Sequence, residues 1–184
     1  MKHIIKPAFS LFLIAAITTA LLGVVYRTTL EPIEIQHRRT QERLMKDILP
    51  QASEFRELEI NAGGNINRVF EGLSGGETTA YILELAPGGY AGTITMLVGI
   101  LKADNNIAGI RVLSHSETPG LGALAVRENF YRRFDGLELV PLRVVKSSPS
   151  TGEIEAITSA TVTTKAITDA VNEAIEWYNK GSFK

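Results

Sequence analysis

The chain is 184 residues long, which is room for one ordinary domain and a short additional segment. Hydrophobic residues make up 45%, charged residues 21%, and the formal net charge is −1, so the basic surface needed for nucleic-acid binding is absent. The sequence has no cysteine, which excludes disulfides, zinc–thiolate sites, iron–sulfur clusters held by the chain and thiol catalysis. His3, His37 and His115 lie far apart, so we expect no metal site, and redox chemistry would require an organic cofactor.

The first predicted element is a transmembrane helix at residues 7–27, which follows a short N-terminus of residues 1–6. No charged residue lies between Lys6 and Arg27. About 20 residues at ~1.5 Å rise each cross a hydrocarbon core of ~30 Å. The alternative is a cleaved signal peptide that starts at Lys2, but the apolar run is longer than the usual ~7–15 residues of such peptides. We therefore expect a retained membrane anchor.

The charges beside this segment do not decide its orientation. Two lysines precede it, and several basic residues follow it: Arg27, Arg38, Arg39, Arg43 and Lys46. Taken alone, the positive-inside rule would place the following domain in the cytoplasm. The rule is weak for long domains, however, because these translocate largely regardless of charge.

A juxtamembrane helix at residues 28–50 is predicted next, with a charged amphipathic part from Glu34 to about Leu49 that Pro50 ends. The domain proper then covers residues 51–184. Its first part, residues 51–76, is rich in turn-forming residues and is expected to be mostly loop.

A strand-rich block follows. Three apolar runs predict neighbouring strands: Thr79–Leu85, Thr93–Leu101 and Ile107–Leu113. Turn-forming residues separate the runs, at positions 87–90 and 104–106, so the strands are expected to be antiparallel.

The rest of the domain is expected to alternate helix and strand. The pattern predicts a helix at Ala123–Phe134, a strand near Leu137–Lys146 and a C-terminal amphipathic helix at Thr164–Asn179. The order of elements predicts an α+β fold, in which a single N-terminal transmembrane helix precedes a compact domain with an antiparallel sheet and flanking helices.

A hydroxyl-rich segment lies immediately before the last helix. Five hydroxyls fall within seven residues: Thr158, Ser159, Thr161, Thr163 and Thr164. The free N–H groups and the dipole of a helix N-terminus favour a phosphate, and the small Ala160 would let a planar ligand approach the backbone. The alternative is an ordinary helix cap, which needs only one Ser or Thr.

The stretch Thr158-Ser-Ala-Thr161 resembles the Ser/Thr-Gly-Ala-Thr flavinylation motif shared by two related families, the G subunit of the Rnf complex and the C subunit of the sodium-pumping quinone reductase. These families usually have Gly in place of Ser159 and Asp in place of Glu155. The resemblance implies that FMN is bound covalently, through a phosphodiester, to Thr161. It also implies that a dedicated flavin transferase makes the bond with FAD as donor.

A second block supports the same resemblance. It comprises the run Gly89-Tyr-Ala-Gly92, the run Gly109-Ile-Arg-Val112 and the loop His115-Ser-Glu-Thr-Pro-Gly-Leu-Gly122. The chain is short for the quinone reductase protein, which favours the Rnf family. The residues expected to contact FMN are Thr161 itself, Thr158, Ser159, Ala160, Thr163 and Thr164 around the phosphate, and Glu117, Thr118, Gly120 and Leu121 near the ring. Two roles stay open for Glu155, which could orient the threonine or a magnesium ion during flavin transfer or could be a surface acid. His115 could be taken for a general base, but with no serine–histidine–acid arrangement in the sequence we expect a structural role.

The resemblance implies an electron-transfer subunit of an ion-translocating oxidoreductase complex that has no catalysis of its own. Its partners would be the other membrane subunits and, during maturation, the flavin transferase. The chain would cross the cell inner membrane once, with the flavin domain on the periplasmic side. Three alternatives stay open: a membrane-tethered sensor or binding module without covalent flavin, the C subunit of the sodium-pumping enzyme, and a free-standing flavoenzyme.

Overall fold

The computed structural model describes residues 2–60 and 63–181. It divides into two compact units, Met1–Gln41 and Glu42–Lys184. The described residues of the first unit belong to helix α1, Lys2–Ile48, which contains Pro7 and Pro32. This helix is continuous where a transmembrane and a juxtamembrane helix were predicted separately.

Helix α1 is, within the described residues, one helix long and apolar enough to cross a membrane. Its most apolar window has a mean hydropathy of 2.4, and none of that window is buried by protein. Hydroxyls in this part bond to the helix backbone: Ser10 donates to the carbonyl of Lys6 at 3.1 Å, and Thr18 to that of Ile14 at 2.9 Å. These bonds satisfy the polar side chains internally, as a hydrocarbon environment requires.

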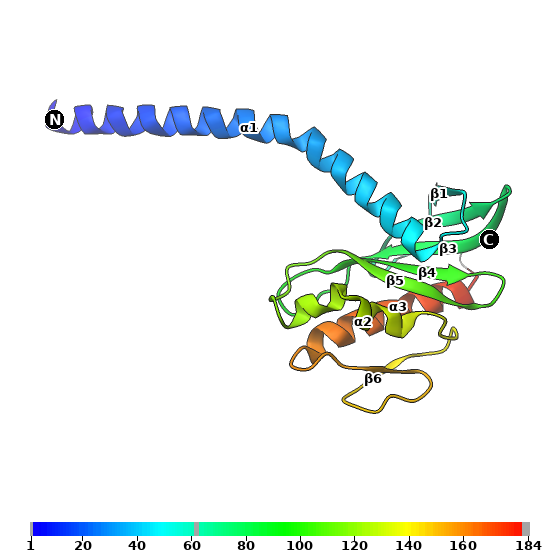
Figure 1. Ribbon diagram of the computed structural model, residues 1–184. Helices are drawn as coiled ribbons and strands as arrows, with labels where there is room; N and C mark the ends of the chain where they lie inside the picture. The colour runs from blue at the N-terminus through cyan, green and yellow to red at the C-terminus, as the bar shows by residue number, and fades with distance from the viewer. Residues whose placement is uncertain (1, 61–62, 182–184) are drawn as a thin grey trace. The chain divides into compact units, whose positions relative to one another are not determined.

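The second unit is built on a five-stranded antiparallel sheet in which sequential strands are neighbours (Figure 1). The strands are β1 (Glu54–Leu58), β2 (Ile66–Ser74), β3 (Glu77–Leu85), β4 (Thr95–Leu101) and β5 (Asn106–Ser114). The three strands predicted from apolar runs correspond to β3, β4 and β5, and their antiparallel pairing is confirmed.

The prediction of a mostly loop-like segment at residues 51–76 is wrong, because β1 and β2 lie there. Strand β1 is a short edge strand whose side chains are mostly exposed, so it lacks an apolar signal. Strand β2 is largely buried, but the charged residues Arg68 and Glu71 interrupt its apolar pattern. Both pair with charges on neighbouring strands, Arg68 with Glu57 and Glu71 with Arg56.

The prediction of one continuous helix at Ala123–Phe134 is also wrong. The structure has three short turns in its place: η1 (Gly122–Val126), α2 (Glu128–Tyr131) and η2 (Arg132–Phe134). Arg127 adopts extended backbone angles between the first two and interrupts the helix. The strand expected near residues 137–146 is reduced to β6 (Arg143–Val145), which pairs in parallel with β7 (Glu153–Glu155).

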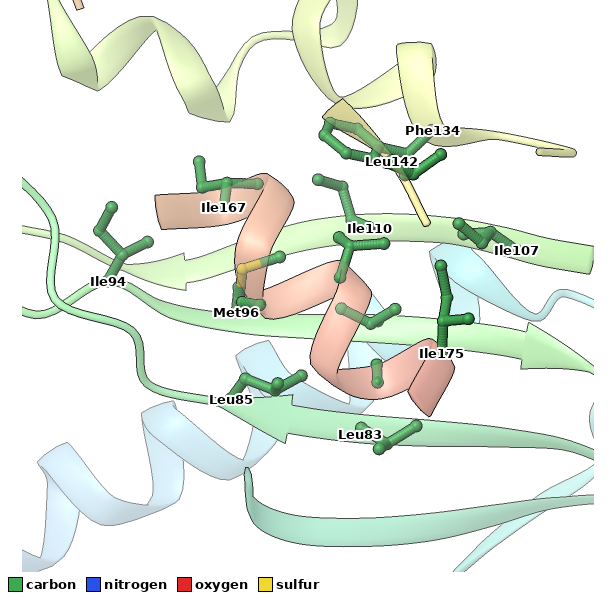
Figure 2. Close-up of a cluster of buried hydrophobic side chains, with 14 of the residues drawn as sticks. Leu83, Leu85, Ile94, Met96, Ile107, Ile110, Phe134, Leu142, Ile167 and Ile175 are labelled. Atoms are coloured by element: carbon green, nitrogen blue, oxygen red, sulfur yellow. The ribbon is translucent and has the colours of Figure 1, made fainter. Parts of the chain in front are cut away.

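Helix α3 (Thr161–Asn179) packs on one face of the sheet and closes the main core (Figure 2). Ile167 and Ile175 on the helix meet strand residues such as Leu83, Met96 and Ile110. The other sheet face carries a smaller cluster that includes Ile48, Leu49, Ile82 and Leu97. Full burial of each such side chain contributes roughly 1.5–3 kcal/mol. These clusters fix α3 on the sheet and so position its N-terminus, and the predicted α+β class is confirmed.

Candidate functional site

A pocket of about 390 Å³ lies at the N-terminus of α3. Its lining comes from three segments: Tyr90 in the turn after β3; Glu117, Thr118 and Leu121 in the loop after β5 with Gly122 at the start of η1; and residues 159–163 at the start of α3. The pocket therefore brings the hydroxyl-rich motif together with two parts of the second block, the turn at Tyr90 and the loop that ends at Gly122. Its volume lies in the range of small-molecule and cofactor sites.

The five hydroxyls of the motif have different surroundings. Thr163 and Thr164 are buried, at 1% and 0% exposure, and both hydroxyls are hydrogen-bonded. The hydroxyl of Thr164 donates to the carbonyl of Ala160 at 3.0 Å and accepts the N–H of Ile157 at 3.0 Å. Thr158, Ser159 and Thr161 are exposed, and of these Ser159 and Thr161 line the pocket.

Helix α3 begins without a side-chain cap. Its N-cap is Ala160, which makes no capping hydrogen bond through its side chain. This excludes the ordinary Ser or Thr cap as the reason for the cluster of hydroxyls. Thr161 is the first helical residue, three positions before the predicted start, so its hydroxyl lies beside backbone N–H groups that have no intrahelical acceptor. An anion placed here would accept those N–H groups and would be stabilised by the helix dipole.

Ser159 adopts a left-handed backbone conformation, with φ +62°. Glycine takes this conformation at little cost, whereas an L side chain costs roughly 1–2 kcal/mol. This accounts for the glycine that the resembled motif usually has at the position. In this chain the turn that presents Thr161 is formed by a serine.

Glu117 joins the three segments of the pocket. Its Oε1 accepts the N–H groups of Tyr90 at 2.8 Å and Ala91 at 3.0 Å, and its Oε2 accepts the hydroxyl of Thr163 at 2.6 Å. The side chain is buried, with 6% exposure. Both oxygens thus accept hydrogen bonds from the protein, and the contact of Glu117 with a flavin ring that the resemblance implies stays a prediction.

The carboxylate of Glu117 is stabilised in its charged form. Burial raises its pKa, but hydrogen bonds from Thr163, Ala91 and Tyr90 and the nearby His115 lower it by more. The net effect is a pKa below the ordinary value of 4.5. Glu117 is therefore a buried negative charge at neutral pH.

Two glycines leave the space that this carboxylate occupies. A Cβ on Gly89 would lie 2.4 Å from Oε1 of Glu117, and a Cβ on Gly122 would lie 2.2 Å from Oε2. Neither distance is possible for a real side chain. The glycines at these positions are consequently required by the close approach of Glu117.

The other predicted residues lie at or near the pocket. Thr118 and Leu121 line it, whereas Gly120, with φ +80°, and Thr164 are outside its lining among the described residues. Glu155 ends β7, and its backbone carbonyl accepts a hydrogen bond from Arg133. Nδ1 of His115 accepts the N–H of Glu117 at 3.1 Å, a contact consistent with the predicted structural role.

Two pocket residues escaped the sequence prediction. Tyr90 is 76% exposed and Val162 is 55% exposed, and with Leu121, at 42%, they place apolar surface around Thr161. A planar aromatic ligand would cover this surface. The sequence could have indicated Tyr90, because an aromatic residue in a glycine-rich turn has no apparent packing role. It could also have indicated Val162, because this apolar residue lies on the polar side of the first helical turn.

The fold and this site define an FMN-binding domain that follows an N-terminal helix in the sequence. Residues 89–176 match the family model of the FMN-binding domain, and residues 1–48 match that of the RnfG N-terminal region. Among solved structures, the C subunit of the Na⁺-translocating NADH–quinone reductase from Parabacteroides distasonis is similar with a TM-score of 0.62 and 19% identity, over 84% of this chain and 98% of that one. NqrC of Shewanella oneidensis has a TM-score of 0.55 and 20% identity, over 72% of each chain.

Relatives of higher identity define the family. The chain is 33% identical to the G subunit of an ion-translocating oxidoreductase complex from Methanosarcina acetivorans, over 96% of this chain and 95% of the relative. It is also 33% identical to the G subunit of the Na⁺-translocating ferredoxin:NAD⁺ oxidoreductase complex of Acetobacterium woodii, over 96% and 92%. The chain belongs to the RnfG family, the G subunits of ion-translocating oxidoreductase complexes. The predicted family and FMN as cofactor are confirmed, and the apolar part of α1 indicates a membrane-anchored protein.

Proposed function

We propose that this chain is the membrane-anchored electron-transfer subunit of an ion-translocating oxidoreductase complex, with FMN esterified through its phosphate to Thr161. FMN supplies the electron-transfer chemistry, and the protein supplies its attachment and surroundings. The partners are then the other membrane subunits of the complex, by analogy with the relatives named above.

The observation that carries this proposal is the different burial of the five hydroxyls. Thr163 and Thr164 are buried and hydrogen-bonded within the protein, and Thr158 lies outside the pocket lining. Ser159 and Thr161 remain, and only Thr161 stands on the first turn of the helix. Its hydroxyl is open to an incoming enzyme and adjacent to the N–H groups that would hold a phosphate.

Attachment requires a flavin transferase with FAD as the donor. In this step the hydroxyl oxygen of Thr161 forms a bond to the phosphorus on the FMN side of FAD, and the bond to the AMP half breaks. The hydroxyl proton is released, and AMP leaves. Residues 159–163 would hold the phosphodiester at the helix N-terminus, and Tyr90, Leu121 and Val162 would offer apolar surface to the ring.

Fluorescence in a denaturing gel tests the attachment. The full-length chain is expressed with a flavin transferase, and the gel is inspected under ultraviolet light. We expect a fluorescent band for the wild type and for Thr158→Ala, and a dark band for Thr161→Ala. A fluorescent band for Thr161→Ala would refute the assignment. A dark wild-type band, from a protein that binds FMN reversibly before denaturation, would indicate a non-covalent module.

We also propose that the flavin domain, residues 51–184, lies on the periplasmic side of the cell inner membrane. Residues 1–6 are then in the cytoplasm, residues 7–27 cross the membrane, and residues 28–50 form the juxtamembrane helix. Because the chain has no cysteine, single cysteines can report each side. Lys102→Cys, in the exposed turn between β4 and β5, should react with a membrane-impermeant maleimide in intact spheroplasts. Lys6→Cys should react only after permeabilisation, and the reverse pattern would overturn the orientation.

A further inference from the structure

Glu117 differs from an ordinary structural carboxylate in having only neutral hydrogen-bond donors. Its two oxygens accept two backbone N–H groups and one hydroxyl. In the described part of the chain no ion pair involves it, and the nearby titratable group is His115. The site therefore contains a buried negative charge that no Lys or Arg neutralises.

This charge lies in the wall of the pocket that contains Thr161. The side chain at position 117 must accept hydrogen bonds from three donors, which are two backbone N–H groups and one hydroxyl. An ionised carboxylate can do so because it has only acceptor atoms. In a partly buried site the field of such a charge is screened less than in water. Addition of electrons to a flavin in this pocket would take place against that field.

We infer that Glu117 is a positioning residue for the flavin site whose fixed charge lowers the reduction potential of FMN held on Thr161. This inference rests on the proposed function. Glu117 also ties the turn at Tyr90 to the first turn of α3, so the same group fixes the pocket in shape and sets its electrostatic potential.

The experiment compares the midpoint potential of full-length flavinylated protein with that of Glu117→Gln. Gln keeps the size of the side chain and one acceptor oxygen for the N–H groups of Tyr90 and Ala91, and it removes the charge. Its amide NH2 takes the place of Oε2 and can donate to the hydroxyl of Thr163, which can accept as well as donate. The control is Glu173→Gln, because Glu173 also accepts hydrogen bonds that hold α3, from the N–H of Asn65 at 2.7 Å and its Nδ2 at 2.8 Å, but lies outside this pocket. Flavin per chain, from the intact mass, is measured on every sample.

We expect Glu117→Gln to carry flavin and to be easier to reduce. The equilibrium constant for reduction should increase about tenfold, or about 30 mV for a two-electron couple, with Glu173→Gln unchanged. An unshifted potential in Glu117→Gln, or an equal shift in both variants, overturns the inference. A folded Glu117→Gln chain that takes no flavin also overturns it, because its role would then be in attachment alone.

If Glu117→Gln does not fold, Thr163→Val decides the question. This variant keeps the charge and removes one donor that partly neutralises it. A more negative potential supports the inference, and an unchanged or more positive one overturns it. A wild-type chain without flavin on Thr161 would instead refute the proposed function, so the two failures are distinguishable.

Discussion

The two ends of α3 are both fixed by a carboxylate, yet they differ in what they leave exposed. Near the C-terminal end, Glu173 binds Asn65 through two hydrogen bonds, and Trp177 packs edge-on against Tyr81 with ring centroids 5.9 Å apart. At the N-terminal end, Glu117 holds the helix through Thr163, but Thr161 and the uncapped N–H groups remain open. One end thus serves stability, and the other combines stability with an exposed reactive group.

The largest stability effect is expected at the C-terminal end. Trp177 is 4% exposed within the main core, and Trp177→Ala should lower the free energy of unfolding by about 3–5 kcal/mol. Val162→Ala, at the exposed N-terminal end, should change it by less than about 0.5 kcal/mol. Chemical denaturation of both variants measures the difference, and equal losses would remove the contrast between the two ends.

A methyl group at Gly122 should damage the N-terminal end specifically. Its Cβ would lie 2.2 Å from Oε2 of Glu117 and 2.7 Å from Oγ1 of Thr163, so their hydrogen bond cannot persist. We expect Gly122→Ala to cost about 1–3 kcal/mol and to reduce flavin attachment. Gly88→Ala, where a Cβ meets nothing within 4 Å, is the control for denaturation and in-gel fluorescence. A Gly122→Ala protein that matches this control would show that Glu117 can move without consequence.

Acid should weaken the N-terminal end through Glu117. The pKa of Glu117 is lowered in the folded state, so its contribution is fully present above its unfolded value, near 4.5, and is lost as the pH falls through the lower folded value. The stability advantage of wild type over Glu117→Gln should therefore shrink below about pH 4.5. Denaturation curves of both proteins at several pH values measure it, and a constant advantage would contradict the assigned charge.

The smallest expected effect is at Ser159. Relief of its left-handed strain in Ser159→Gly is partly offset by the greater freedom of glycine in the unfolded chain. A net gain of about 0.5 kcal/mol should appear in denaturation experiments, whereas Thr158→Gly should give no gain. If Ser159→Gly destabilises the protein, the left-handed turn is not a source of strain.

The sequence predicted those parts of the fold that have a simple apolar pattern. Strands β3 to β5 and helix α3 bury continuous or periodic apolar residues, and these were found. Strands β1 and β2 were missed because charges such as Arg68 and Glu57 pair across strands and hide the alternation. The prediction of a helix through residue 127 was wrong because nothing in the sequence pattern indicates the extended backbone of Arg127.

At the site, the structure brings several of the predicted residues to one pocket, but the sequence did not predict how their surroundings differ. The hydroxyls of Thr161 and Thr163 are equivalent in composition, and only the start of α3 and the position of Glu117 separate an open hydroxyl from a buried one. Likewise, the three protein donors to Glu117 were not predicted, because they come from residues 26, 27 and 46 positions away in the sequence. Long-range contacts of this kind leave no local signal.

The most direct test of the central claim is a mass spectrum of the tryptic peptide 147–165, which contains all five hydroxyls of the motif from Thr158 to Thr164. The peptide should be taken from full-length protein expressed with a flavin transferase. We predict that it carries one FMN phosphoester and that fragmentation places it on Thr161. An unmodified peptide, or FMN on Thr158, Ser159, Thr163 or Thr164, would contradict the account.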